Sequence, residues 1–222
     1  FELWPRGVKV LSLFFIDRVD RYRVYEPEVH GGLYALMFEE EYAGALNSKA
    51  PRRIAKAAGI GKGTRLECYE AVGAPLARDP HAVHQGYFAK DKKGKFKDSK
   101  GAAGTADDAG AFELIMQKKE TLISFPDRKG ADKDVSFVFS HSALKEGWDN
   151  PNVFQICTLV ETKDNLTKRQ KIGRGLRLCV NQDGARLYDP EANVLTVIAN
   201  ESYDDFATGL QKELEAEDFK FG

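Results

Sequence analysis

The stretch VKVLSLFFI, from Val8 to Ile16, is a nearly unbroken apolar run. A strand in the middle of a parallel sheet is covered on both faces, so its sequence is continuously apolar rather than alternating. The length of this run and its valine, phenylalanine and isoleucine content fit such a strand. We therefore predict a buried strand here, and the rest of the chain indicates what surrounds it.

Four further segments are typical of strands, and amphipathic segments separate them. Strands are expected at 81–88, 135–141, 153–160 and 193–200. Helices are expected at 34–46, after Asp107, after a cap at Asp164 or Asn165, and at 201–217. Two of these helices have an apolar face, made of Phe112, Ile115, Met116 and Leu122 in one and of Phe206, Leu210 and Leu214 in the other. Buried strands that alternate with helices imply an α/β fold, a parallel sheet with helices on both faces.

Neither a proline- or serine-rich linker nor an internal repeat divides the chain. We therefore expect a single domain over residues 1–222, with an inserted loop or hairpin at about 89–105. The chain starts at Phe1 rather than at a methionine, so we expect it to be part of a longer protein.

Composition limits the classes of function. Hydrophobic residues make up 42% and charged residues 30% of the 222 residues, as in an ordinary globular protein. The net charge of −1 means that contact with nucleic acid needs a local basic patch.

Cys68, Cys157 and Cys179 form no Cys-x-x-Cys pair, which indicates buried thiols in a reducing compartment. No apolar stretch approaches the ~18 residues of a membrane span and no signal peptide is recognisable, so we expect a cytoplasmic protein with no membrane partner.

Three patterns suggest functions that their details do not support. AGIGKGT, at 58–64, lacks the Ser or Thr that follows the lysine of a phosphate loop, and no strand precedes it. His81 and His84 would face opposite sides of a strand with no carboxylate or thiol cluster to join them, so no metal site is expected. The Pro-Asp of FPDRKG, at 125–130, has no Glu-x-Lys at a useful distance, so no nuclease centre is expected.

The segment at 89–105 is rich in lysine and glycine. Its lysines are Lys90, Lys92, Lys93, Lys95, Lys97 and Lys100, and Asp91 and Asp98 dilute them. A solvated loop is the simpler interpretation, and contact with a phosphate backbone is the other.

Two stretches hold residues suited to binding chemistry, and the first is SHSALKEGWDNPNV (Ser140–Val153). Ligand sites in parallel α/β sheets gather at the carboxyl ends of strands, which directs attention to the segments after Ile16, His141 and Val160. Gly147 permits an unusual backbone conformation, and Asp149 follows it. A carboxylate held there can accept a hydrogen bond from a ribose hydroxyl, and a simple turn cap is the alternative.

The second stretch is QKIGRGLRL (Gln170–Leu178). Gln170, Gly173 and Arg174 share one helical face, and Arg177 comes about one turn later. Guanidinium groups stay charged and match phosphate oxygens with two hydrogen bonds, so the arginines suit an anion. A basic helix terminus that complements the helix dipole is the alternative.

Together these stretches resemble helicase motifs of superfamily 2. The pattern Gln-x-x-Gly-Arg-x-x-Arg at 170–177 resembles the sixth motif, and Glu-Gly-Trp-Asp at 146–149 resembles the fifth. VKVLSLFFID, at 8–17, lies where the fourth motif belongs. The longer strings, with GYFAKDKKGKFKD at 86–98 and ELIMQKKETLISF at 113–125, resemble the restriction (Res) subunit of type III restriction-modification enzymes over essentially the whole chain.

This resemblance implies a second RecA-like lobe, the C-terminal lobe of a helicase motor of the P-loop NTPase class. Arg174 and Arg177 match its arginine fingers, which stabilise the transition state of phosphoryl transfer. Gln170, Gly173, Gly147 and Asp149 match residues that bind ATP. His141 and Ser142 match positions that contact the DNA backbone, although many helicases have a threonine there.

The resemblance also implies partners. ATP and Mg²⁺ would be bound mainly by a first RecA-like lobe, whose phosphate loop this sequence lacks, and no metal ligands are expected within the chain. The other partners would be double-stranded DNA and a methyltransferase (Mod) subunit, and a nuclease domain would follow further along the Res chain. On its own the chain is expected to be inactive.

Two alternatives remain open at this point. The chain could belong to another DNA helicase or translocase of superfamily 2, or it could be a RecA-like DNA-binding module without catalysis. A Pro-Asp…Glu-x-Lys domain after Gly222 would favour the type III restriction endonuclease, an ATP-dependent hydrolase.

Overall fold

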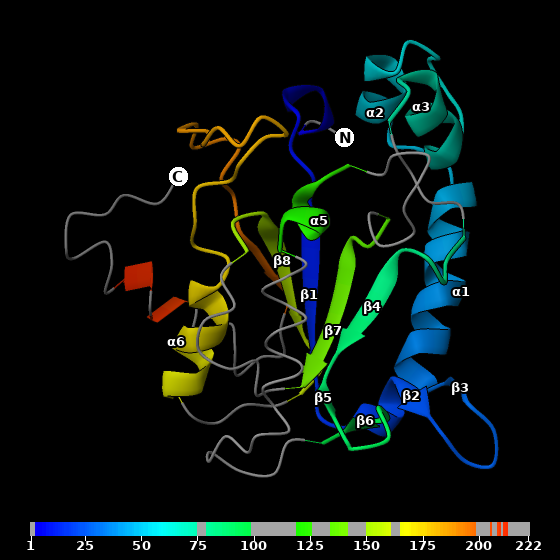
Figure 1. The fold of residues 1–222 in the computed structure, drawn as a ribbon. Helices are drawn as coiled ribbons and strands as arrows, with labels where there is room; N and C mark the ends of the chain where they lie inside the picture. The colour runs from blue at the N-terminus through cyan, green and yellow to red at the C-terminus, as the bar shows by residue number, and fades with distance from the viewer. Residues whose placement is uncertain are drawn as a thin grey trace.

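The computed structural model describes residues 3–74, 79–98, 119–125, 134–141, 150–160 and 165–198, together with 205, 208, 209, 211 and 212. Its main sheet has the strand order β4-β7-β1-β8-β9, and every neighbouring pair is parallel (Figure 1). The strands are β1 (Leu11–Ile16), β4 (His84–Tyr87), β7 (Phe137–His141), β8 (Val153–Thr158) and β9 (Thr196–Ile198). Each of the five predicted strands is therefore present, shorter than its predicted segment.

Both faces of the sheet are apolar, as the unbroken run at β1 predicts. Leu13 pairs with Val138 and Ile156, and the next residue, Phe14, pairs with Phe139. Because successive side chains point to opposite faces, these two sets lie on opposite sides. They belong to two separate clusters of buried residues.

Helices cover both of these faces. On the Phe14 face lies α1 (Leu33–Asn47), whose Phe38 ring is 4.8 Å from the ring of Phe137 and 5.6 Å from that of Phe139. On the Leu13 face lie α5 (Lys119–Ile123), which contributes the buried Leu122, and α6 (Asn165–Gly173), whose Lys171 lies over Phe15. The predicted fold class, a RecA-like parallel sheet with helices on both faces, is confirmed.

Smaller elements surround this frame. They are η1 (Trp4–Arg6), η2 (Val19–Arg21), β2 (Arg23–Val24), β3 (His30–Gly31), α2 (Arg52–Ala57), α3 (Arg65–Ala71), β5 (Ala89–Lys90) and β6 (Phe96–Lys97). The strands β5 and β6 pair antiparallel, so the predicted insertion begins as a hairpin, and residues 99–105 lie outside the described part. Among the described helices, none combines the length and the apolar character needed to cross a membrane.

The glycine-rich segment at 58–64 links α2 to α3. Gly59 and Gly61 have φ values of 75° and 70°, a region that favours glycine. Thr64 then caps α3 by a capping box, in which its hydroxyl accepts from the Glu67 N–H and the Glu67 carboxylate accepts from the Thr64 N–H. The segment links two helices and no strand precedes it, which agrees with the exclusion of a phosphate loop.

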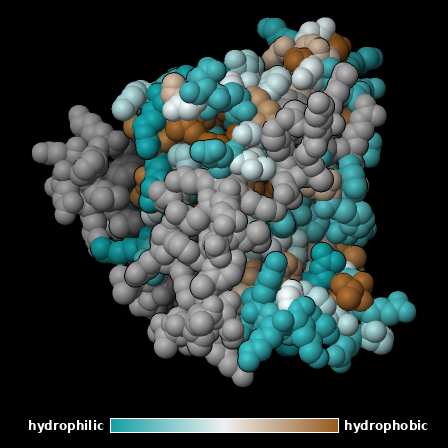
Figure 2. All heavy atoms as spheres, viewed as in Figure 1, coloured by the Kyte–Doolittle hydropathy of each residue, from teal (hydrophilic) through white to brown (hydrophobic). Residues whose placement is uncertain are grey.

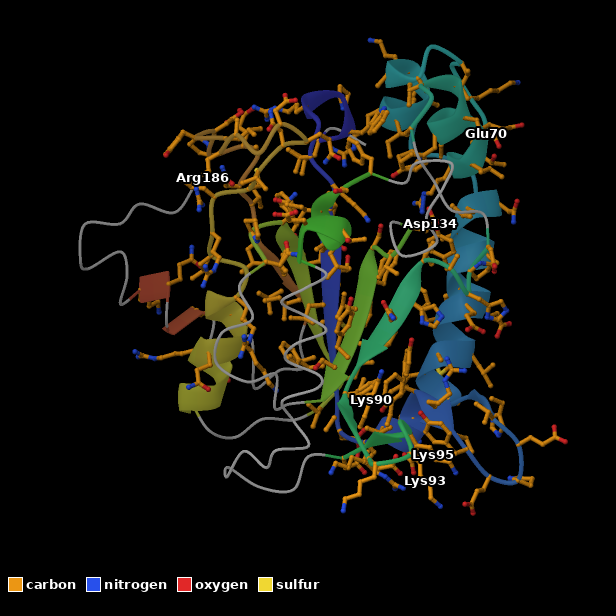
Figure 3. All side chains as sticks on the ribbon, viewed as in Figure 1. Glu70, Lys90, Lys93, Lys95, Asp134 and Arg186 are labelled. Carbon is orange, nitrogen blue, oxygen red and sulfur yellow. The ribbon has the colours of Figure 1, made fainter. Side chains whose placement is uncertain are left out.

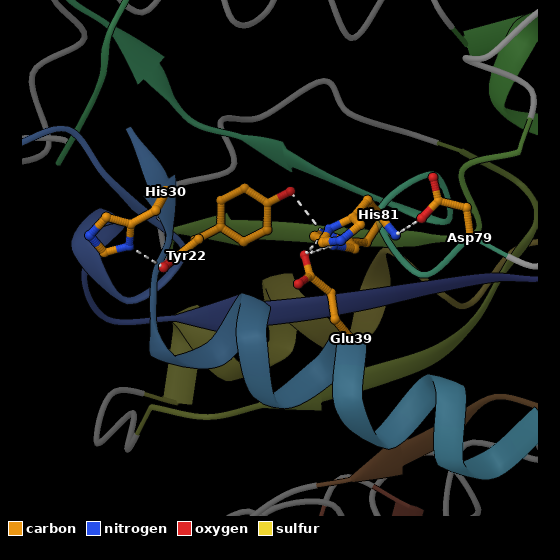
Figure 4. A network of polar contacts seen from close by, with 7 residues as sticks. Tyr22, His30, Glu39, Asp79 and His81 are labelled. Carbon is orange, nitrogen blue, oxygen red and sulfur yellow. Dashed lines mark hydrogen bonds and ion pairs between the residues drawn. The ribbon is translucent and has the colours of Figure 1, made fainter. Parts of the chain in front are cut away.

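The prediction that His81 and His84 face opposite sides of a strand, with no carboxylate to join them, was wrong. The strand β4 begins only at His84, so His81 lies in a preceding turn and the alternation of a strand does not separate the two. Both histidines approach the same carboxylate oxygen of Glu39, His81 through Nδ1 at 2.9 Å and His84 through Nε2 at 3.0 Å (Figure 4). The carboxylate comes from α1, which the spacing of histidines alone could not indicate.

The structure describes only part of the two apolar helix faces that the sequence predicts. Leu122 is buried as expected, whereas Phe112, Ile115, Met116, Phe206, Leu210 and Leu214 lie outside the described residues. The three cysteines are buried and unbridged, as the sequence indicated.

Candidate functional site

His141 is the last residue of β7, at the carboxyl edge of the sheet. It pairs with Ile16 at the end of β1, and the preceding Ser140 pairs with Tyr87 at the end of β4. The predicted DNA-contacting segment therefore starts where three neighbouring strands end together. Ser142, Gly147 and Asp149 lie outside the described residues, as does the side chain of His141.

QKIGRGLRL spans the end of α6, which stops at Gly173. Lys171 and Ile172 are buried, while Gln170 and Gly173 are exposed. The predicted face of the helix is thus the one turned away from the sheet. Arg174 follows in the turn after the helix and is half-buried, and Arg177 is exposed.

Lys171 fixes the opposite face of α6. Its ammonium group lies 4.9 Å from the centroid of the Phe15 ring in β1, a cation–π contact. Burial lowers the pKa of Lys171 to about 8, because a charged amine is disfavoured away from water. Lys171 lies inside the motif and attaches it to the central strand, a role that no sequence pattern indicated.

Asn152, whose role no sequence pattern indicated, attaches the end of the first stretch to the backbone just after the second. Its side-chain Nδ2 donates to the carbonyl of Val180 at 3.0 Å, and its Oδ1 accepts from the N–H of Val180 at 2.9 Å. Asn152 is fully buried, and its own carbonyl accepts from the N–H of Leu11 at 2.9 Å. A buried amide with both of its polar atoms paired holds a backbone segment firmly.

This contact holds the end of the first stretch next to the residues that follow the second. Asn152 comes three residues after Asp149, and Val180 comes three residues after Arg177. In the sequence, the only sign of this role of Asn152 is the second asparagine of Asn-Pro-Asn. A buried asparagine needs hydrogen-bond partners for its side-chain amide. The contact itself depends on the path of the chain through α6.

The contact between Asn152 and Val180 lies away from the carboxyl ends of the strands, to which the sequence had directed attention. Asn152 directly precedes β8, so its pairing with Val180 lies at the amino end of that strand. After β8 the chain returns through α6 toward the starting end of the strands (Figure 1). The segment after His141 therefore begins at one edge of the sheet, and the arginine stretch leads to the other.

The glycines on either side of Arg174 differ in their surroundings. A Cβ atom on Gly175 would lie 2.4 Å from Cδ1 of Leu195, which packs against the core. A Cβ on Gly173 would have no heavy atom of the described residues within 4 Å beyond its own helix turn. Packing among the described residues therefore explains why position 175 is glycine, but it does not explain Gly173.

Near the end of α6, the described residues offer positively charged groups rather than metal ligands. Within the part of the chain that the structure describes, no group of three or more His, Cys, Asp or Glu side chains could hold a metal ion. Arg174 and Arg177 instead supply two guanidinium groups within four residues. Such groups suit the oxygens of a phosphate chain.

Fold and candidate site together define the class, a RecA-like α/β fold with an arginine stretch at the end of a helix. No protein-family model matches the chain. The chain is 35% identical over 197 residues to the type III restriction-modification enzyme StyLTI Res subunit of Salmonella typhimurium, an alignment that covers 84% of this chain and 17% of the relative. It is 37% identical to the EcoPI Res subunit of Escherichia phage P1 and 35% identical to the EcoP15I Res subunit of Escherichia coli, each over 187 residues, 83% of this chain and 16% of the relative.

The chain is thus identified as a Res-subunit region of the type III restriction-modification family, as the motifs indicated. It spans about one sixth of the length of the curated relatives that it matches.

Proposed function

We propose that residues 1–222 form the second motor lobe of an ATP-dependent type III restriction endonuclease. In this role the lobe completes an ATP site whose phosphate loop and Mg²⁺ ligands belong to a first RecA-like lobe. ATP hydrolysis would then drive communication along double-stranded DNA in a complex with a methyltransferase (Mod) subunit. The fold class and the Res-subunit relatives support this proposal.

One observation carries the proposal furthest, the double hydrogen bond between Asn152 and Val180. It ties the backbone that follows the Gly147–Asp149 stretch to the backbone that follows Arg177. Two segments that are separate in the sequence, each of which the resemblance links to nucleotide binding, are thereby attached to each other. A joint site for one ligand requires this kind of proximity.

Each residue has a proposed role. Arg174 and Arg177 stabilise the negative charge that develops on the γ-phosphate, while Gln170 and Gly173 arrange them against the nucleotide. Gly147 and Asp149 face the nucleotide from the neighbouring stretch, with Asp149 placed to accept a hydrogen bond from a ribose hydroxyl. His141 and Ser142, at the carboxyl edge, contact the DNA backbone.

The test is the replacement of each arginine in the full-length protein. We expect Arg174→Ala and Arg177→Ala to lower DNA-stimulated ATP hydrolysis by about 10³- to 10⁵-fold, as for arginine fingers in general, because the transition-state charge loses its stabilising partner. ATP binding should stay largely intact, since the first lobe holds most of the nucleotide. Steady-state hydrolysis and equilibrium binding of a fluorescent ATP analogue measure the two effects.

Arg186→Ala is the matched control. Arg186 is an exposed arginine on the same C-terminal half of the chain, in the segment after Val180 (Figure 3). Its replacement should leave hydrolysis unchanged. Wild-type turnover in both the Arg174 and Arg177 variants would contradict the finger assignment and would favour a DNA-binding module without catalysis.

A further inference from the structure

The lysine-rich β5–β6 hairpin is a fixed element rather than a loose loop. The N–H of Phe96 donates to the hydroxyl of Tyr25 at 2.8 Å, and the N–H of Val19 donates to Oδ1 of Asp98 at 2.7 Å. The rings of Phe96 and Phe88 lie 5.3 Å apart, which attaches the hairpin to the end of β4. A solvated loop needs no such anchoring, so the simpler interpretation of this segment does not account for its structure.

The acidic residues of the hairpin are engaged with backbone groups. Oδ1 of Asp91 accepts from the N–H of Lys93 at 2.8 Å and from that of Lys95 at 2.9 Å, which closes the turn. Oδ1 of Asp98 is the acceptor for Val19. Each carboxylate thus serves the fold of the hairpin. The lysines are more numerous, so the hairpin keeps a net positive charge.

The lysines are arranged around the turn. Lys92 and Lys93 are exposed at its tip. Two other lysines lie over aromatic rings, Lys90 with Nζ 5.8 Å from the centroid of Phe96 and Lys95 with Nζ 5.4 Å from that of Tyr25. Figure 3 places Lys90, Lys93 and Lys95 together at one end of the molecule, and Figure 2 shows a hydrophilic surface over this end.

The hairpin lies at the edge of the sheet where the DNA contacts are proposed. The strand β4 ends at Tyr87, which pairs with Ser140 of β7, and β5 starts two residues later. Neighbouring strands are about 4.8 Å apart, so the base of the hairpin lies close to the backbone at His141. A DNA duplex that contacts the end of β7 would therefore pass next to the hairpin.

We propose that the β5–β6 hairpin is a second contact to duplex DNA, in which Lys92 and Lys93 bind backbone phosphates without reading the sequence. This inference rests on the proposed function, because it extends the DNA site at the end of β7. Lysine provides a flexible point charge, and phosphate contacts of this kind carry no direct sequence information.

The experiment compares the full-length wild-type protein with a Lys92→Ala/Lys93→Ala variant. Binding to labelled random-sequence duplex DNA is measured without ATP by fluorescence anisotropy, at several salt concentrations between about 50 and 200 mM. Each lost phosphate contact should reduce the slope of log K against log salt by about 0.9, so we expect a slope shallower by about 1.8. The affinity should fall by a similar factor for duplexes of different sequence.

Lys56→Ala/Lys62→Ala is the matched control, since it also removes two exposed lysines, but near α2 at the opposite end of the molecule (Figure 1). The proposal is overturned if the hairpin variant keeps the wild-type slope or if the control variant changes it equally. It is also overturned if the slope changes with single-stranded RNA but not with duplex DNA. A Lys92→Glu/Lys93→Glu variant, with unchanged thermal unfolding, should weaken binding further.

This readout is independent of the arginines, because no ATP is present. A shallower slope in the lysine variant together with wild-type hydrolysis in the arginine variants would leave the hairpin contact standing and reject the fingers. An unchanged slope in the lysine variant together with lost hydrolysis in the arginine variants would reject only the hairpin contact.

Discussion

Gly173 and Gly175 flank Arg174, yet the fold explains only one of them. We expect Gly175→Ala to destabilise the chain, because the added methyl group would lie 2.4 Å from Cδ1 of Leu195 and force the turn after α6 to shift. Overpacking of this kind typically costs about 1–3 kcal/mol. Urea unfolding of the 222-residue chain measures the change in the free energy of unfolding.

Gly173→Ala is the companion variant and should behave in the opposite way. It adds a methyl group at an exposed helical position with no described atom in reach, where alanine is preferred over glycine by up to about 1 kcal/mol. Stability should be kept or slightly raised, while ATP hydrolysis by the full-length protein should fall if the nucleotide needs that space. A Gly173→Ala variant with full hydrolysis would remove this residue from the proposed site.

At the scale of elements, the contact between α1 and β4 depends on a buried histidine. Nδ1 of His84 lies 3.0 Å from the Tyr22 hydroxyl and Nε2 lies 3.0 Å from Glu39 (Figure 4). A carboxylate only accepts hydrogen bonds, so we assign the proton to Nε2 and make Nδ1 the acceptor for Tyr22. Burial lowers the pKa of His84, and the hydrogen bond to Glu39 offsets only part of this effect.

The lowered pKa predicts a loss of stability in acid. As the pH falls below about 6.5, His84 gains a proton in the unfolded chain more readily than in the folded one, so the free energy of unfolding decreases. We expect this decrease between pH 7.5 and pH 5.5 to be smaller in a His84→Gln variant, which cannot titrate. Urea unfolding at the two pH values measures the difference.

His30→Gln is the control for this effect, because His30 is an exposed histidine in β3. That variant should retain the pH dependence of the wild-type chain. An equal dependence in the His84→Gln variant and the wild type would show that another group is responsible.

At the scale of the whole molecule, the Asn152–Val180 contact and His141 of the proposed DNA segment lie toward opposite ends of the strands. Asn152 and Val180 meet before β8, whereas His141 ends β7. The six residues of β8 span about 20 Å, so the parallel sheet is the rigid body between the two ends.

The proposed division of the ATP site between two lobes predicts that the isolated chain does not hydrolyse ATP. The 222 residues contain no Gly-x4-Gly-Lys-Ser/Thr phosphate loop, so arginine fingers alone would have no bound triphosphate to act on. Release of phosphate by the purified chain, with and without duplex DNA, should equal the background. Turnover that follows the fragment through purification, and that Arg174→Ala abolishes, would contradict the lobe assignment.

The sequence by itself determined the parallel α/β fold and the family. Continuous apolar runs such as 8–16 identify strands that are covered on both faces, and this property depends on local sequence alone. The spacing of Gln170, Gly173, Arg174 and Arg177 was equally visible, because one short stretch of sequence contains them all.

Only the tertiary structure decided which distant residues meet. The pairing of Asn152 with Val180, the convergence of His81 and His84 on Glu39 and the anchoring of the lysine hairpin on Tyr25 each join segments from different elements. No periodicity encodes such contacts, because they depend on the order of strands in the sheet and on the path of the helices between them. For the same reason the two stretches could be recognised from sequence, but the separation along the strands between His141 and the Asn152–Val180 contact could not.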